Sequence, residues 1–141
     1  MPKKHGSAHW EGSLKEGTGT VSMESGALDK QPYGFGQRFE DKPGTNPEEM
    51  IAAAHASCFS MALSMVLGQS EMTPSAIDTD CTVTLDQVDG GFAVTKSHLD
   101  VTVSVPGASE QDVLDACETA KANCPISKLL ATEITMDAKV V

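Results

Sequence analysis

The stretch NPEEMIAAAHASCFSMALSMVLG, residues 46–68, predicts the longest helix of the chain. Asn46 is a favourable N-cap, and Pro47 suits the first helical position. Glu49 follows Asn46 at the spacing of a capping box, in which a carboxylate at the third helical position reaches back to the cap. The glycine that closes the stretch predicts the helix end, so we expect the helix to run from Pro47 to about Leu67.

One side of this expected helix is apolar and contains a cysteine. Five residues with spacings of three and four form this stripe, which is typical of an amphipathic helix: Ile51, Ala54, Cys58, Met61 and Met65. We therefore expect the Cys58 thiol to face the protein core or an interface.

The residues before the long helix predict strands and turns. Residues 8–14 and 18–22, separated by the turn residues 15–17, are typical of a β-hairpin. Residues 31–44 are rich in glycine and proline, which predicts a long loop or an irregular sheet edge rather than a helix. Such a loop can carry Arg38 towards a site.

The residues after the long helix predict three further strands. Residues 80–88 and 92–105 alternate between apolar and polar side chains, as expected of strands with one buried face. The sequence Asp-Gly-Gly at residues 89–91 supplies a turn, so these two segments predict a second hairpin. A final strand is expected at residues 133–141.

A second helix is expected between these strands, beginning at Ser109 with Asp112 in a partial capping-box position. Proline at position 125 interrupts it and suits the first turn of a new helix. Cys124 is therefore expected at the N-cap of a short helix over residues 125–130. The buried face of the second helix is predicted from four positions at helical spacing: Val113, Ala116, Cys117 and Ala120.

The order of strands, helix, strands, helix and strand predicts an α+β fold with an antiparallel sheet rather than an alternating parallel fold. The chain has 141 residues, a length that suits a single domain over residues 1–141.

The charge balance argues against several partners. The formal net charge of -10 would repel nucleic-acid phosphates and anionic lipid surfaces. We see no stretch that approaches the roughly 20 apolar residues needed to span a bilayer, and residues 1–13 contain no apolar signal-peptide core. We therefore expect a cytoplasmic protein with neither nucleic acid nor membrane as a partner.

The four cysteines, at positions 58, 81, 117 and 124, include no Cys-x-x-Cys pair. Neither a zinc ribbon nor a thioredoxin-like site is therefore indicated, and a stable structural disulfide is not expected in the cytoplasm. Two interpretations of the four cysteines remain: they are catalytic thiols, or they are buried small apolar residues. The strand and helix patterns favour the second interpretation for Cys81 and Cys117.

A peroxide-reducing cysteine needs a cation that stabilises its thiolate and a second thiol that resolves its sulfenic acid. Arg38 is the only arginine, and a guanidinium binds anions in a planar, bidentate manner that lysine cannot reproduce. Glu48 could pair with Arg38 and orient it, with Glu49 as the rival. Burial would raise the pKa of Cys58, whereas a helix N-terminus favours a thiolate at Cys124. The residues alone do not decide which thiol attacks first.

Four runs, AHWEGSLKEGTGTVS, PYGFGQRFE, GTNPEEMIAAAHASCFSMALS and KANCPIS, resemble the OsmC branch of the OsmC/Ohr hydroperoxide resistance family. The resemblance implies that Cys58 is the peroxidatic cysteine and Cys124 the resolving one, with Arg38 and Glu48 in the same site. It also implies reduction of organic hydroperoxides through a Cys58–Cys124 disulfide.

The same resemblance implies an intertwined homodimer with long central helices between two sheets and two sites at the subunit interface. An external dithiol would reduce the disulfide, and dihydrolipoyl groups are the reductant that the family suggests. Phe39, Phe59, Met61 and Met65 would provide apolar walls for an organic peroxide. No cofactor is expected.

Two alternatives come from other classes of protein. One is a stress-protective or small-ligand-binding dimer without enzymatic activity, in which Cys58 is buried and Arg38 holds an anion. The other is a hydrolase that uses Cys58 with His55, which lies three residues before it. His55 and Cys58 would also supply only half of a metal site, so no metal is expected.

Overall fold

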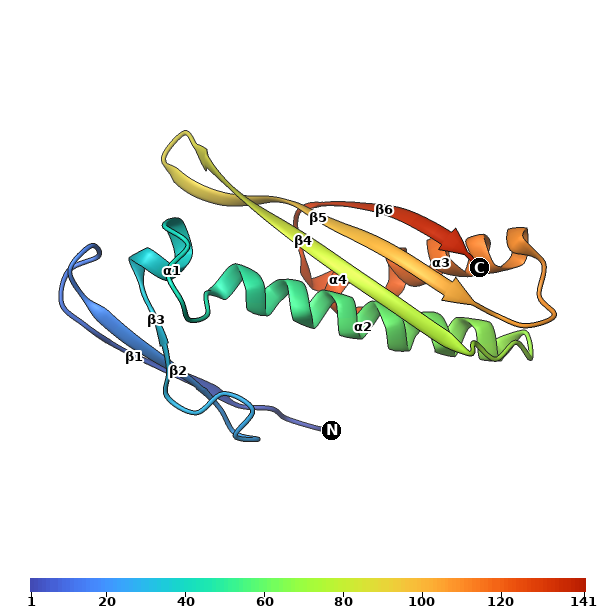
Figure 1. Ribbon diagram of the computed structural model, residues 1–141, viewed down its shortest axis with the longest axis horizontal. Helices are drawn as coiled ribbons and strands as arrows, with labels where there is room; N and C mark the ends of the chain where they lie inside the picture. Colours follow the sequence, from blue (N-terminus) through green and yellow to red (C-terminus); the bar gives the residue numbers. More distant parts are fainter. The chain divides into compact units, whose positions relative to one another are not determined.

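The computed structural model describes residues 1–141 (Figure 1). The chain divides into two compact units, residues 1–50 and 51–141, which are described separately. The single domain expected over the whole chain stays a prediction.

The first unit contains a three-stranded antiparallel sheet in the order β1 (Gly6–Glu11), β2 (Thr18–Met23) and β3 (Gln31–Tyr33). Strands β1 and β2 form the predicted hairpin. Strand β1 ends three residues earlier than expected, because the chain turns where Gly12 adopts a φ of 92°. Gly17 closes this turn by donating its backbone N–H to the Ser13 carbonyl at 2.8 Å.

A short helix, α1 (Phe35–Phe39), lies where a loop was expected, so that prediction is wrong for these residues. Arg38 donates its backbone N–H to the Gly34 carbonyl at 3.1 Å, which closes one helical turn. Gly36 is buried, and a Cβ at this position would lie 2.2 Å from Cδ of Lys42. Glycine at position 36 therefore allows the Lys42 side chain to pack closely. Arg38 lies on a helix rather than on a loop.

Helix α2 (Pro47–Gln69) begins as predicted. Oδ1 of Asn46 accepts the backbone N–H of Glu49 at 2.8 Å, which confirms the N-cap. The Glu49 carboxylate meets the Asn46 side-chain amide at 3.5 Å rather than the backbone N–H of a full capping box. The helix ends two residues later than expected, next to Glu71 with a φ of 59°.

The second unit contains a mixed sheet in the order β4 (Ala76–Val88), β5 (Gly91–Ser104) and β6 (Glu133–Val140). Strands β4 and β5 form the predicted antiparallel hairpin. Strand β6 pairs with β5 in parallel, so the expectation of antiparallel pairing is wrong here. The chain passes through α3 (Glu110–Asn123) and α4 (Pro125–Leu129) between these strands (Figure 1). Such a helical crossover returns the chain to the end where β5 began, which makes the strands parallel.

The core of the second unit lies between α2, α3 and the inner face of β5. The predicted buried face of α3 is confirmed, and Cys124 is the N-cap of α4 as expected. The predicted stripe of α2 does not form the core, because Met61 and Met65 are 78% and 63% exposed. Helix α2 is apolar on several sides, so its sequence pattern does not select the inward face. The buried side chains of α2 are His55, Phe59, Leu63 and Leu67.

Helix α2 also corrects the expectation that no segment approaches the length and apolarity of a membrane span. Its 23 residues include a window with a mean hydropathy of 1.7, sufficient by length and composition alone to cross a bilayer. Core helices of soluble proteins satisfy the same criterion. Only 22% of that window is buried, so much apolar surface of α2 remains exposed in the isolated chain.

Replacing Leu63 tests whether this face of α2 anchors the core. Leu63 is fully buried, so Leu63→Ala should lower the free energy of unfolding by about 2–5 kcal/mol, through lost apolar contacts and a residual cavity. Leu129→Ala is the matched control, because Leu129 is 74% exposed and its loss should change stability by about 0.5 kcal/mol or less. Urea unfolding at equal protein concentration measures both changes. Equal losses in the two variants would contradict the assigned core.

Candidate functional site

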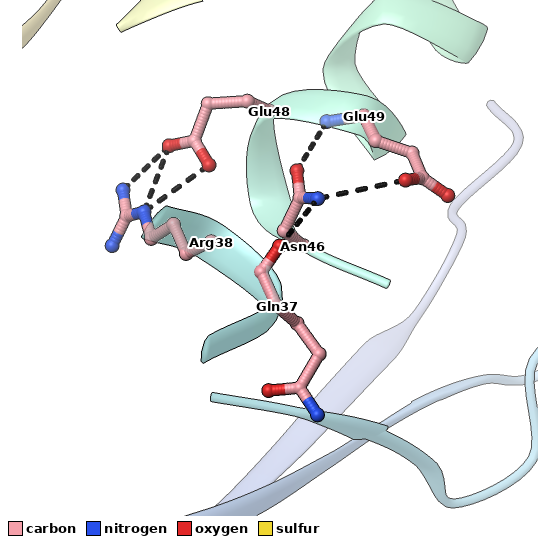
Figure 2. A network of polar contacts seen from close by, with 5 residues as sticks. All are labelled: Gln37, Arg38, Asn46, Glu48 and Glu49. Atoms are coloured by element: carbon pink, nitrogen blue, oxygen red, sulfur yellow. Dashed lines mark hydrogen bonds and ion pairs between the residues drawn. The ribbon is translucent and has the colours of Figure 1, made fainter. Parts of the chain in front are cut away.

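Arg38 and Glu48 form a close ion pair between α1 and the start of α2 (Figure 2). Nη2 of Arg38 lies 2.6 Å from Oε1 of Glu48, and Nε lies 3.0 and 3.1 Å from the two carboxylate oxygens. The predicted pairing of Arg38 with Glu48 is therefore confirmed. Nη1 takes no part in this ion pair, so the guanidinium keeps one edge for a further anion or oxygen.

Asn46 links the two helical segments that carry this pair (Figure 2). Its Oδ1 caps α2, while its Nδ2 donates to the Gln37 carbonyl of α1 at 3.1 Å. Glu49 contacts Asn46 and also accepts from Oγ1 of Thr45 at 3.4 Å. Glu49 thus belongs to the capping network, which leaves Glu48 as the partner of Arg38.

An apolar cavity of about 210 Å³ lies beside the Arg38 side chain, within the first unit. Phe39 is the only one of its walls that the sequence predicts. The missed signal is the aromatic pair Trp10 and Tyr33 on β1 and β3, whose ring centroids lie 5.6 Å apart. The side chains around this cavity are Trp10, Leu14, Tyr33, Phe35, Arg38, Phe39 and Pro47.

Two of the predicted thiols come together in the second unit. Cys58 lies in the middle of α2 and is half-buried, whereas Cys124 begins α4 and is 1% exposed. Burial raises the pKa of the Cys58 thiol, and the neighbouring Cys124 thiol raises this pKa further as a hydrogen-bond partner and through its charge. The backbone N–H of Ile126 opposes this rise. Cys58 therefore needs a nearby cation to become a thiolate at neutral pH.

The other two cysteines have different surroundings. Cys117 is fully buried in the core as predicted, and burial, with a smaller effect of Glu118, raises its pKa to about 11. Cys81 is half-buried on β4 and lies 3.2 Å from Oγ of Ser97, so it is not purely a packed apolar residue. Burial also raises the pKa of Cys81.

His55 is fully buried and bonded to two serines. Its Nδ1 lies 2.7 Å from Oγ of Ser97, and its Nε2 lies 2.8 Å from Oγ of Ser127. Burial lowers the pKa of His55, which favours the neutral imidazole. Because both ring nitrogens are engaged by serines, His55 does not form the pair with Cys58 that a Cys-His hydrolase requires.

The predicted site residues thus lie in two groups. Arg38 and Glu48 belong to the first unit, and Cys58 and Cys124 belong to the second. Of the four expected apolar walls, Phe39 lines the cavity in the first unit, whereas Phe59 lies in the core of the second. The two remaining walls, on α2, are the exposed methionines described above.

Comparisons with known proteins cover nearly the whole chain. The family model described as OsmC-like protein matches residues 39–139. Peroxiredoxin OsmC of Escherichia coli strain K12 is 57% identical over 95% of this chain and 94% of its own. The organic hydroperoxide resistance protein OhrB of Bacillus subtilis strain 168 is 30% identical, over 86% of this chain and 87% of its own. A solved OsmC-like protein of unknown function from Vibrio cholerae superposes with a TM-score of 0.76 at 19% identity, covering 98% of this chain and 99% of that one.

Proposed function

Because this chain belongs to the OsmC-like protein family, we propose that it is a thiol-dependent peroxidase that reduces organic hydroperoxides to alcohols. The observation that carries the proposal is the packing of half-buried Cys58 against the buried cluster that contains Cys124, close enough for the Cys124 thiol to raise the pKa of Cys58. Two adjacent thiols can pass from a sulfenic acid to a disulfide without a large movement of the chain.

In the proposed cycle, the Cys58 thiolate attacks an oxygen of the hydroperoxide. An S–O bond forms, the O–O bond breaks, and the departing alkoxide takes a proton to become an alcohol. Cys124 then attacks the sulfur of the Cys58 sulfenic acid, so that an S–S bond forms and water leaves. An external dithiol regenerates both thiols by exchange, and we propose a dihydrolipoyl group in this role. This chemistry suits the cytoplasm, because a disulfide that forms there is reduced again and does not persist as a structural bond.

Exposure supports Cys58 as the attacking thiol. A hydroperoxide must reach the attacking sulfur, and Cys124 is 1% exposed whereas Cys58 is half-buried. Access decides between them, because a buried thiolate without access to the hydroperoxide does not react with it.

Arg38 is the proposed activator of Cys58. The raised pKa of Cys58 calls for a cation, and Arg38 is the only guanidinium in the chain. Its Nε and Nη2 are engaged by Glu48, which leaves Nη1 to contact the thiolate or the peroxide. Glu48 and Cys58 both belong to the sequence of helix α2, Glu48 in its first turn.

The apolar cavity beside Arg38 supports an organic rather than an inorganic peroxide. Aromatic walls favour alkyl or aryl groups, because transfer of apolar surface from water is favourable. The guanidinium at the edge of the cavity could bind the peroxide oxygens while the organic group occupies the apolar part.

We also propose that the chain works as a homodimer. Met61 and Met65 expose apolar surface on α2, along the predicted stripe that includes Cys58. A contiguous exposed apolar stripe on a long helix is typical of an interface. A second copy of the chain would cover it, with two symmetry-related sites.

The proposed disulfide can be tested by peptide mapping. Cumene hydroperoxide should convert Cys58 and Cys124 into one intramolecular disulfide, while Cys81 and the fully buried Cys117 stay reduced. Cys58→Ser should abolish turnover, whereas Cys124→Ser should retain one sulfenic acid per chain, because nothing resolves it. A sulfenic acid trapped on Cys124 in Cys58→Ser would reverse the roles, and unchanged thiols would favour a binding protein without peroxidase activity.

The role of Arg38 can be tested by substitution. Arg38→Lys and Arg38→Ala should lower hydroperoxide turnover by roughly 10- to 1000-fold, as expected for loss of one preorganised electrostatic donor. Without the cation, the pH dependence of Cys58 alkylation should shift to higher pH, and each pKa unit corresponds to about 1.4 kcal/mol. Glu48→Gln should have a milder effect, because the cation remains. Lys4→Ala, which removes an exposed cation at the amino end, is the control.

Wild-type behaviour of Arg38→Lys in both assays would contradict the proposed activation. A loss of turnover with an unshifted alkylation profile would assign Arg38 to substrate binding alone.

The proposed dimer can be tested at the exposed stripe of α2. Wild-type protein should remain dimeric at nanomolar concentration in light scattering, whereas Met61→Asp should dissociate the dimer by placing a charge in the apolar interface. Val88→Asp is the control, because Val88 is also an exposed apolar residue but lies on β4. A folded wild-type monomer with full activity would count against the interface.

A further inference from the structure

A continuous chain of hydrogen-bonding groups crosses the core of the second unit and ends at the proposed resolving thiol. Sγ of Cys124 lies 3.0 Å from Oγ of Ser127, which lies 2.8 Å from Nε2 of His55. On the other side of the ring, Nδ1 of His55 lies 2.7 Å from Oγ of Ser97, which lies 3.2 Å from Sγ of Cys81. The proposed cycle assigns no role to His55 or to either serine.

All members of this hydrogen-bonded chain except the half-buried Cys81 are shielded from water. His55 and Ser97 are fully buried, Ser127 is 6% exposed and Cys124 is 1% exposed. A buried thiol that must lose its proton has no bulk water to accept it. The Ser127 hydroxyl is hydrogen-bonded to Sγ of Cys124, and the same hydroxyl is hydrogen-bonded to Nε2 of His55.

The hydrogen-bond geometry allows proton transfer away from Cys124. In a neutral imidazole one nitrogen donates and the other accepts. If Nδ1 donates to Ser97, then Nε2 accepts from the Ser127 hydroxyl, and that hydroxyl oxygen can accept from the Cys124 thiol. Ser97 in turn can donate to Cys81, so the two groups on the far side of the ring are compatible with the tautomer that accepts a proton at Nε2.

We propose that His55, acting through Ser127, takes up the proton of Cys124 when this thiol attacks the sulfenic acid of Cys58. The inference rests on the proposed roles of the two cysteines. Ser127 contacts the reacting sulfur and is the catalytic residue of this step. His55 acts only through Ser127 and is a positioning residue that holds the proton.

The step balances in atoms and charge. The thiol proton of Cys124 moves to Oγ of Ser127 as the Ser127 hydroxyl proton moves to Nε2 of His55. The sulfur of Cys124 forms the S–S bond, and the S–O bond of the Cys58 sulfenic acid breaks. The departing hydroxide becomes water with the proton that His55 has taken up, which returns His55 to its neutral form. The backbone N–H of Ser127, 3.3 Å from Sγ of Cys124, stabilises the developing thiolate.

Few titratable groups face His55. Cys81 on β4 lies 3.9 Å from Nδ1, β5 contributes Ser97, and α4 contributes Ser127 with Cys124 behind it. On its own helix, Cys58 lies one turn further along. The lowered pKa of His55 has burial as its cause, so the imidazole is a neutral acceptor at and above pH 6.5 and loses this capacity only as the pH falls through the lowered pKa.

The test is a rapid-mixing experiment on the reduced full-length protein. One equivalent of cumene hydroperoxide is added, and the sulfenic acid and the disulfide are followed by acid quench and mass spectrometry from pH 6 to 9. In wild type, the rate of conversion of sulfenic acid to disulfide should be nearly flat from pH 6.5 to 8. In Ser127→Ala and His55→Gln this rate should fall roughly 100-fold or more at pH 7, so that the sulfenic acid accumulates.

The pH profile separates a proton relay from a purely structural role. Without the relay the thiol must ionise by itself, so the conversion rate in Ser127→Ala should rise with pH and approach that of wild type in alkaline solution. Ser127→Thr retains a hydroxyl and should recover most of the rate. Ser60→Ala is the matched control, because Ser60 is a half-buried hydroxyl on α2 that bonds to Thr79 and lies outside the relay.

The outcomes distinguish this inference from the proposed function. Failure of wild type to form the Cys58–Cys124 disulfide would contradict the proposed cycle itself. Normal disulfide formation in wild type, together with wild-type rates and a flat pH profile in Ser127→Ala, would overturn the relay. Equal losses in Ser127→Ala and Ser127→Thr would also overturn it, because the hydroxyl would then not be responsible.

Discussion

The packing of α2 against the inner face of β5 is the interaction on which the second unit depends. Phe59, Leu63 and Leu67 recur every four residues on α2 and share one buried cluster with alternate residues of the strand, none of which is more than 3% exposed. The same spacing places His55 at the start of this buried face, one turn before Phe59. Cys58 is the neighbour of an anchored residue, so its thiol is positioned by the core rather than by a mobile loop.

Features determined within one or two helical turns could be predicted from the sequence. Asn46 caps α2, and Cys124 caps α4, because each acts on backbone groups three residues away. Features that depend on a distant partner could not. The Lys42 side chain packs against Gly36 of helix α1 from outside that helix, and the direction of β6 depends on the connection that precedes it. Apolar residues on several sides of α2 likewise left its inward face undecided.

The candidate site follows the same division. A carboxylate partner for the single guanidinium at Arg38 could be predicted, whereas the residues alone did not decide between Glu48 and Glu49. The contacts of Ser97 and Ser127 with His55 could not be predicted, since serine is common and the role of its hydroxyl depends on the group that it contacts. His55 attracted attention for its closeness to Cys58 in sequence, yet its partners come from β5 and α4. Buried polar networks are therefore read from the structure rather than from spacing.

The parallel pairing of β6 has a consequence for how the chain reaches its native state. The β4–β5 hairpin joins neighbouring residues and can form early, whereas β6 can pair only after the whole crossover through α3 and α4 is in place. Until then β5 is an edge strand with unpaired backbone groups, and such edges invite pairing with other chains. The carboxyl-terminal eight-residue strand β6 is thus also a cover for β5, and truncation there would expose an aggregation-prone edge before it disturbed either thiol.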